Sequence, residues 1–337
     1  MKCPFCKEGT LDIIYKSYPG YVEGSRFDIY LCPVCDTHTA VGNASAQEVY
    51  DIIYKAHNFP GYERYYHYAH EIKNVKNPLQ YLSDKESSYY PVYQDIEENQ
   101  KNKLDILEVG CGYGYLTYAL REKGHSVQGI DGSQQSINFA LSHFGPYFEQ
   151  CDLSVWLPQC RKSFDRIVAT ELIEHLPDPG AFILNCIKLL KPNGKLILTT
   201  PNKDFASRQA VWKTELPPVH YFWFSRKSFS IFGTEHNLHM KFIQFKSYYP
   251  KYENILGSAI LKKLIREPQG AILLKDGSPN IKPNAVGLRK ILRFLLVRIS
   301  PIRNFSNWIY NCCSRYSWVL AVAISPGHDN GHNKEIN

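Results

Sequence analysis

Two pairs of cysteines near the start of the chain have the spacing of a metal site. Each pair is a CxxC knuckle, Cys3 with Cys6 and Cys32 with Cys35. Four thiolates at such spacing typically bind one structural zinc ion in a closed tetrahedral site. A coincidental arrangement or a redox couple is the alternative. We therefore expect a zinc ribbon over residues 1–40, serving folding, docking or substrate presentation.

A glycine-rich segment has the composition of a ligand-binding turn. Residues 107–114 read Leu-Glu-Val-Gly-Cys-Gly-Tyr-Gly, between an apolar run and an amphipathic stretch. Glycines let the backbone turn tightly and let a ligand approach closely. Asp131 closes the next expected strand, where a carboxylate can bind ribose hydroxyls. Tyr115 stands where a dinucleotide fingerprint needs its third glycine, so the spacing argues against that class of ligand.

A second group of polar residues follows the fourth expected strand of the sheet. Glu171, Glu174 and His175 have i, i+3 and i+4 spacing, which places them on one face of a helical turn. They suit a divalent cation such as Mg²⁺, or His175 can act as a general base, or the group can be structural. His220, which follows Pro217 and Pro218, is either a further catalytic residue or a histidine packed under aromatic rings.

A parallel sheet is needed to bring these residues together. Apolar runs alternate with amphipathic stretches over residues 101–325, the pattern of repeated βαβ units. We expect strands at Asp105–Val109, Ser126–Ile130, Tyr147–Cys151, Asp165–Ala169, Lys195–Thr200, Lys241–Tyr248 and Trp318–Ile324. Helices are expected at about 115–123, 133–143, 179–190 and 225–236, with a turn at 192–194. The fold class is therefore α/β, with a seven-stranded, mostly parallel, doubly wound sheet.

Five motifs in this order resemble those of class I, Rossmann-like S-adenosylmethionine-dependent methyltransferases. They are the acidic residue and glycines from Glu108 to Gly114, Asp131, Asp152 after the third strand, residues 170–179 and residues 190–195. The resemblance covers roughly residues 101–250 and the final strand. It implies that the seventh strand, Trp318–Ile324, runs antiparallel to the others.

The resemblance also implies which residues contact S-adenosylmethionine. These are Glu108, Gly110, Cys111, Gly112, Gly114, Asp131, Gly132, Asp152, Leu153 and Thr170. The ExxEH element from Glu171 to His175 is similar to that of the small-molecule branch, including ubiquinone-type O-methyltransferases, and in some of those enzymes it binds magnesium. The catalytic candidates are thus Glu171, Glu174, His175 and His220.

Three functions remain in competition. The leading interpretation is methylation of a hydroxyl on a small molecule, a glycan or a lipid-linked acceptor. An RNA methyltransferase is the first alternative, because zinc ribbons precede some of these enzymes, although the fourth strand lacks an N-P-P-Y type ending. The second alternative is a non-catalytic cofactor-binding module, against which the intact glycines and acidic residues argue.

The net charge of +7 is concentrated in one part of the chain. Residues 282–315 contain seven basic and no acidic residues, interleaved with apolar side chains. Such a segment suits an anionic membrane surface or a cover over the substrate cleft. Nucleic acid is not expected as a partner, because the basic charge does not line a broad groove.

Composition shifts divide the chain into four parts. After the ribbon we expect a tyrosine-rich helical connector or cap at 41–100, a methyltransferase domain at 101–325 with a helical insertion at 252–316, and a disordered tail at 326–337. No apolar run approaches the roughly 18 residues of a membrane span, and the start lacks a secretory signal. We therefore expect a cytoplasmic protein, with peripheral membrane contact as the alternative.

Overall fold

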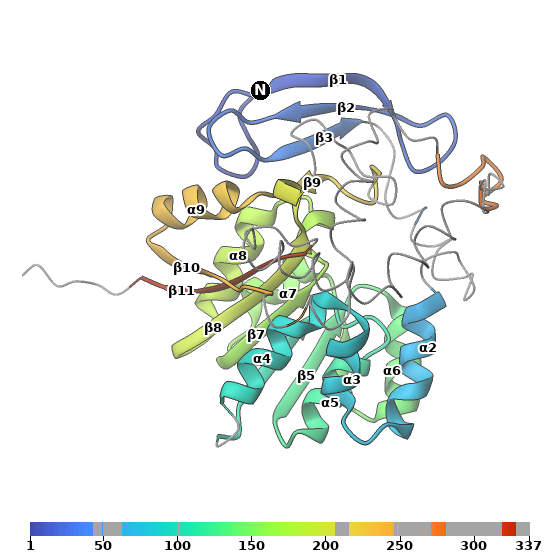
Figure 1. Ribbon diagram of the computed structural model, residues 1–337, viewed down its shortest axis with the longest axis vertical. Helices are drawn as coiled ribbons and strands as arrows, with labels where there is room; N and C mark the ends of the chain where they lie inside the picture. The colour runs from blue at the N-terminus through green and yellow to red at the C-terminus, as the bar shows by residue number, and fades with distance from the viewer. Residues whose placement is uncertain are drawn as a thin grey trace, which may run out of the picture.

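The larger of the two sheets carries the parallel core of the protein. The computed structural model describes residues 1–42, 49, 63–99, 102–205, 216–245, 248, 271–280 and 319–327. Within these residues the strand order of the larger sheet is β10-β11-β8-β7-β4-β5-β6 (Figure 1). Its strands are β4 (Asp105–Val109), β5 (Ser126–Asp131), β6 (Phe148–Gln150), β7 (Phe164–Thr170), β8 (Leu190–Pro201), β10 (Leu238–Phe242) and β11 (Val319–Pro326).

Strand direction confirms the predicted fold class. β4, β5, β6, β7 and β8 pair in parallel, and β11 runs antiparallel to both β8 and β10. Two details of the prediction were wrong. The strand expected at Lys241–Tyr248 is β10, which starts and ends earlier, and the turn expected at 192–194 lies inside β8 as an irregularity in its pairing with β7.

Helices cover both faces of this sheet because its strands alternate apolar side chains between the faces. Ile106, Val168 and Ile197 pack against one helical layer, while Leu107, Ile167 and Leu196 pack against the other. The helices that follow the strands are α5 (Tyr115–Glu122), α6 (Gln134–Phe144), α7 (Leu153–Gln159), α8 (Pro179–Lys188) and α9 (Arg226–Glu235). α7 was not expected from the sequence; it is short and begins where Asp152 caps its first turn.

The described part of the expected connector is helical and joins one of these layers. It contains α2 (Glu63–Glu71), η1 (Ile72–Asn74), α3 (Pro78–Lys85), η2 (Ser87–Tyr89) and α4 (Tyr90–Glu98). Its buried side chains, such as Ile72, Leu79 and Leu82, share a cluster with Leu116 of α5 and Ile106 of β4.

The smaller sheet combines the N-terminal segment with a short strand from much later in the chain. Its order is β1 (Asp12–Pro19), β2 (Arg26–Leu31), β3 (His38–Gly42) and β9 (Phe222–Trp223), all antiparallel. The ribbon expected at the N-terminus therefore takes its fourth strand from the segment that follows His220. Figure 1 shows β1, β2 and β3, in blue, with β9, in yellow, and α9 beside them.

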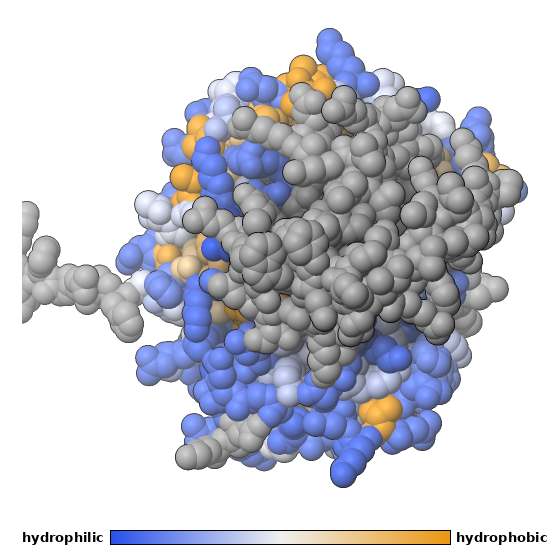
Figure 2. All heavy atoms as spheres, in the orientation of Figure 1, coloured by the Kyte–Doolittle hydropathy of each residue, from blue (hydrophilic) through white to orange (hydrophobic). Residues whose placement is uncertain are grey.

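Some expected features lie outside the described residues. They include the basic segment 282–315, the insertion 252–316 apart from 271–280, and the tail from 328 onward. In the described part of the chain no helix has the length and apolar character needed to cross a bilayer. The described atoms visible in Figure 2 are mainly hydrophilic, with small hydrophobic patches among them.

A buried ion pair fastens α4 to the sheet and gives a stability prediction. Asp95 accepts a 2.6 Å hydrogen bond from Arg166 of β7, and both side chains are less than a tenth exposed. We expect Asp95→Ala to lower the free energy of unfolding by about 3–5 kcal/mol, because it leaves a buried guanidinium without its partner. Chemical denaturation measures this loss.

The matched control lies on the same helix. Glu97 pairs with Lys123 at 2.6 Å, but about a quarter of each side chain is exposed. We expect Glu97→Ala to cost about 1 kcal/mol or less. Equal losses in the two variants would contradict this view of how α4 is held.

Candidate functional site

The glycine-rich loop connects β4 to α5 at the carboxyl edge of the larger sheet. Gly110, Gly112 and Gly114 have positive φ angles of 75°, 50° and 81°. A Cβ atom at Gly114 would lie 2.6 Å from the Phe148 ring, so packing alone requires glycine there. A Cβ atom at Gly112 would meet nothing within 4 Å, so this part of the loop borders open space. The loop thus has the close-approach surface that the sequence predicts.

Asp131 holds the loop from the end of β5. Its Oδ2 accepts a 2.8 Å hydrogen bond from the Gly112 N–H, and its Oδ1 accepts one of 2.8 Å from Ser133 N–H. Burial raises the pKa of Asp131, while these two bonds favour the charged form. The structure brings the loop and this carboxylate together, as the spacing of the motifs predicts.

Glu108 lies beneath the loop. It is buried, and the Thr117 hydroxyl of α5 donates a short hydrogen bond to its carboxylate. Burial raises the pKa of Glu108 to about 8. The sequence places Glu108 among the cofactor contacts; the structure shows it bonded to α5, where it supports the loop from below.

The other expected cofactor contacts gather at the same edge. Cys151 N–H donates to the Asp131 carbonyl at 3.0 Å, which sets the start of α7 beside the end of β5. Asp152 accepts bonds from the backbone and hydroxyl of Ser154, and these bonds lower its pKa. The remaining candidates lie in the loop or at the strand ends nearby: Cys111, Gly132, Leu153 and Thr170.

The acidic segment after β7 does not form the expected α-helical face. Glu171 has a positive φ of 51°, and the chain then makes the short turn η3 (Ile173–His175). Glu174 is buried and accepts a 2.9 Å hydrogen bond from the Thr200 hydroxyl. Burial raises the pKa of Glu174 to about 8, and burial together with the Glu174 charge raises that of Glu171 well above its ordinary value.

The structure adds His220 to this segment. Ligand atoms of Glu174, His175 and His220 lie within 4.8 Å of one another, a grouping that does not include Glu171. The two imidazole rings are 4.5 Å apart between centroids and meet edge to face at 79°. The expected trio of Glu171, Glu174 and His175 is thus replaced by one to which two loops contribute.

The tautomer of His175 follows from its partner. Its Nδ1 lies 2.6 Å from the Val219 carbonyl, which can only accept, so Nδ1 carries the proton. Burial lowers the pKa of His175 to about 4, and burial together with His175 lowers that of His220 well below its ordinary value. Both imidazoles are therefore neutral near pH 7, and Nε2 of His175 lies 3.7 Å from Glu174 Oε1.

The four cysteines of the two knuckles lie close together in the ribbon. The Sγ atoms of Cys3 and Cys35 are 3.7 Å apart, as are those of Cys6 and Cys32. A disulfide would need about 2.05 Å. The edge of a tetrahedron of sulfurs about 2.3 Å from a central zinc ion is about 3.8 Å. All four side chains are buried, so the donor set and its spacing fit a zinc ion.

The helices before the sheet bring residues that sequence reasoning missed. The hydroxyls of Tyr89 and Tyr115 are 2.5 Å apart, Tyr68 donates to Glu86 at 2.9 Å, and Arg64 pairs with Glu86 at 2.7 Å. The charges of Glu86 and Arg64 both act on the Glu171 carboxyl, which places this group next to the acidic segment. The many tyrosines at 41–100 were the signal in the sequence that could have indicated this group of residues.

Comparison with known proteins matches part of this chain to a methyltransferase family. Residues 79–240 match the family described as "Methyltransferase domain". A ubiquinone biosynthesis O-methyltransferase from Idiomarina loihiensis is 36% identical over 125 residues, covering 35% of this chain and 51% of that protein. The human mitochondrial enzyme of the same name is 39% identical over 108 residues, covering 30% of this chain and 29% of that protein. The chain thus spans about half the length of the first relative and less than a third of the second.

Two solved structures are similar to this chain at low identity. The plantazolicin methyltransferase BpumL in complex with SAH is 14% identical, with a TM-score of 0.42 over 84% of this chain and 98% of that one. Magnesium protoporphyrin IX methyltransferase from Synechocystis PCC 6803 with bound SAM is 18% identical, with a TM-score of 0.40 over 60% of this chain and 92% of that one.

The position of Asp131 gives a binding prediction. We expect Asp131→Ala to weaken S-adenosylhomocysteine binding at least about tenfold, because hydrogen bonds to a charged group contribute about 1.5–3 kcal/mol each. Isothermal titration calorimetry measures the change. Asp178→Ala, which removes the N-cap of α8, is the control and should bind normally. Wild-type affinity in the Asp131 variant would remove the basis for placing a cofactor here.

Proposed function

Because the chain carries a class I, S-adenosylmethionine-dependent methyltransferase domain, we propose that it transfers the cofactor's methyl group to a hydroxyl of a small-molecule acceptor. The observation that carries this proposal is the neutral imidazole of His175. It follows β7, at the same carboxyl edge of the larger sheet as the glycine-rich loop. The names of the relatives, ubiquinone biosynthesis O-methyltransferases, support an oxygen acceptor.

The residues at the carboxyl edge fit this cofactor. Gly112 gives the backbone an open approach, and we propose that Asp131, which it contacts, binds the ribose hydroxyls and that Asp152 binds the adenine. When bound, the cofactor supplies an activated methyl group on sulfur, so the chain's main tasks are alignment and removal of the acceptor's proton.

We assign proton removal to Nε2 of His175. Its Nδ1–H is fixed by the Val219 carbonyl, so the ring presents Nε2 in one orientation. His175 is also the more exposed of the two imidazoles, at 19% of its side chain, while His220 is 6% exposed. His220 then packs edge-on and holds the His175 ring, and the largely uncharged Glu174 and Glu171 leave the acceptor's oxygen as the place where negative charge develops.

A divalent cation is the second candidate role for this trio. The close approach of ligand atoms from Glu174, His175 and His220 is the observation that favours it. Two imidazoles and one carboxylate suit a transition metal better than magnesium, which prefers oxygen ligands, and no observation supports magnesium. Loss of methyl transfer on chelation, with recovery on adding one metal, would support this role only where the four cysteines keep their own zinc throughout.

The proposed reaction is tested by following labelled methyl groups. Purified protein and cofactor with a labelled methyl group, incubated with fractionated extracts, should label the small-molecule fraction. Label confined to RNA would favour the zinc-ribbon RNA methyltransferase. No label in any fraction, with normal cofactor binding, would favour the non-catalytic module.

His175 gives a prediction about the chemical step. We expect His175→Ala to lower kcat about 10²–10⁴-fold, the usual contribution of a general base, with unchanged affinity for S-adenosylhomocysteine. Activity should also fall as pH approaches about 4, where His175 takes up a proton. If His175→Ala is harmless and His220→Ala abolishes turnover, the proton acceptor is His220.

We also propose that the four cysteines bind zinc and that the chain divides as its composition suggests. The ribbon is 1–40, the connector or cap 41–100, and the methyltransferase domain 101–325, with an insertion at 252–316 and a tail at 326–337. Elemental analysis should find about one zinc per chain. Cys32→Ser should lose it, whereas Cys160→Ser, outside the cluster, should retain it. A folded wild-type protein without metal would contradict the assignment.

We propose that the protein is cytoplasmic and makes peripheral contact with anionic membranes. The basic charge of 282–315 supports the membrane contact. Each basic residue near such a surface contributes about 1 kcal/mol. We expect co-sedimentation with vesicles that contain anionic lipid at low salt and its loss at high salt. Protein that remains in the supernatant at low salt would instead favour a cleft cover and a soluble acceptor.

A further inference from the structure

We infer that the cysteine ribbon positions the acceptor side of the active site, so that its metal determines where His220 and the Glu174 loop lie. The catalytic part of this inference rests on the proposed function; the structural part does not. The ribbon is thus a positioning element for methyl transfer and not an appended module.

Backbone hydrogen bonds connect the second knuckle to the catalytic loops. Cys32 N–H donates to the Thr37 carbonyl at 2.9 Å, and β3 starts at the next residue, His38. β3 pairs with β9, the strand two residues after His220. Between them Tyr221 accepts from Ala40 N–H at 2.9 Å and donates to the Glu174 carbonyl at 2.9 Å. A few residues therefore separate the cysteines from both loops of the site.

Side-chain hydroxyls make a second connection, from the knuckle to α9. The Sγ of Cys35 lies 3.1 Å from the Thr37 hydroxyl, which is 2.9 Å from that of Ser228. Ser228 and Ser225 form the capping box of α9. The Thr37 hydroxyl donates to that of Ser228. The sulfur of Cys35 is thus connected through two hydroxyls to the N-terminus of a helix in the methyltransferase domain.

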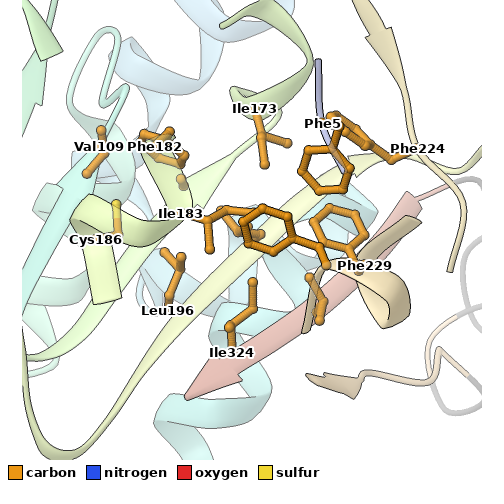
Figure 3. Close-up of a cluster of buried hydrophobic side chains, with 14 of the residues drawn as sticks. Phe5, Val109, Ile173, Phe182, Ile183, Cys186, Leu196, Phe224, Phe229 and Ile324 are labelled. Atoms are coloured by element: carbon orange, nitrogen blue, oxygen red, sulfur yellow. The ribbon is translucent and has the colours of Figure 1, made fainter. Parts of the chain in front are cut away.

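Packing around the first knuckle makes the third connection. Phe5 stacks on Phe232 of α9 at 4.8 Å between ring centroids and meets Phe224 edge to face at 5.0 Å. Figure 3 shows Phe5 beside Phe224 and Phe229, in one cluster with Ile173, the residue before Glu174. The buried Lys203 donates to Asp36 at 2.6 Å and closes the same boundary.

A fourth connection holds the start of the His220 loop. Tyr21, in the ribbon, donates through its N–H to the Pro217 carbonyl at 2.7 Å. The Tyr21 carbonyl accepts from Leu273 N–H at 2.9 Å, and Leu273 is buried with Leu216 and Val219. The ribbon therefore fixes both ends of residues 217–221, including the Val219 carbonyl that sets the tautomer of His175.

The glycine loop takes its bonds from a different place. Gly110 and Cys111 donate to the Ile130 carbonyl, and Gly112 donates to Asp131. Loss of the metal should therefore disturb the acceptor side while cofactor binding persists.

Hydrogen–deuterium exchange on the full chain tests this difference. Removing the metal, by chelation or by Cys32→Ser, should raise exchange at Tyr221 and Ala40 at least about tenfold. Peptides from 105–131 should keep their protection, and affinity for S-adenosylhomocysteine should stay within about twofold. Adding zinc back to the chelated protein should restore the exchange pattern. In methyl transfer, kcat should fall while KM for the cofactor stays unchanged.

A milder variant keeps all four cysteines. Thr37→Val removes the hydroxyl between Cys35 and Ser228 and should raise exchange in 217–228 about 2–10-fold with zinc retained, the range expected for one hydrogen bond. Thr37→Ser, which keeps the hydroxyl, should behave like the wild type. Wild-type exchange at Tyr221 in metal-free protein would overturn the inference. Simultaneous loss of cofactor binding would also overturn it, because the ribbon would then support the whole fold. Neither readout requires an acceptor, so both stand apart from the proposed reaction.

Discussion

The backbone of Tyr221 joins the smaller sheet to the segment that follows β7. Its N–H donates to the carbonyl of Glu174 in η3, and its carbonyl accepts from Ala40 N–H of β3. Backbone groups buried between layers must find partners, so this residue can only lie where both partners are present. Its neighbours on either side are His220 and β9. The position of His220, a catalytic candidate, therefore depends on the pairing of β9 with β3, a strand from the N-terminal part of the chain.

Burial explains the electrostatics of the site. Glu171, Glu174, His175 and His220 lie where water is largely excluded, so each group is shifted toward its neutral form. Two carboxyls and two imidazoles can share so small a volume because none of them need be charged. Such a region accepts a neutral hydroxyl without electrostatic penalty, and the sulfonium charge of a bound cofactor would favour the anion that forms when the proton leaves.

The sequence predicted local features well and contacts between distant segments poorly. The strands β4, β5 and β7 and the glycine loop follow from apolar runs and glycine spacing, because both signals are local. The i, i+3, i+4 spacing of the ExxEH element suggested a helical face, but the positive φ of Glu171 leads into a short turn. The pairing of Thr39 with Phe222 joins residues far apart in the chain, and no periodicity signals it. For the same reason His220 and His175 were both recognised as candidates, but the contact between their rings was not predicted.

The four cysteines illustrate the same limit. Their spacing predicts a metal site from the sequence, and their buried sulfurs at tetrahedral distances fit it. The spacing does not predict the surface against which the knuckles pack. The contacts of Phe5 and Thr37 with α9 join distant segments and are visible only in the folded structure. A closed metal site, which has no chemistry of its own, thereby becomes part of the scaffold around the reacting groups.

We propose that this scaffold directs a methyl group to oxygen. The most direct measurement is the ¹³C NMR spectrum of the product formed from cofactor with a ¹³C-labelled methyl group, since methyl groups on oxygen, nitrogen and carbon resonate in separate ranges. We expect a single O-methyl signal on a small molecule. A label found on nitrogen or carbon, or in RNA, would contradict it.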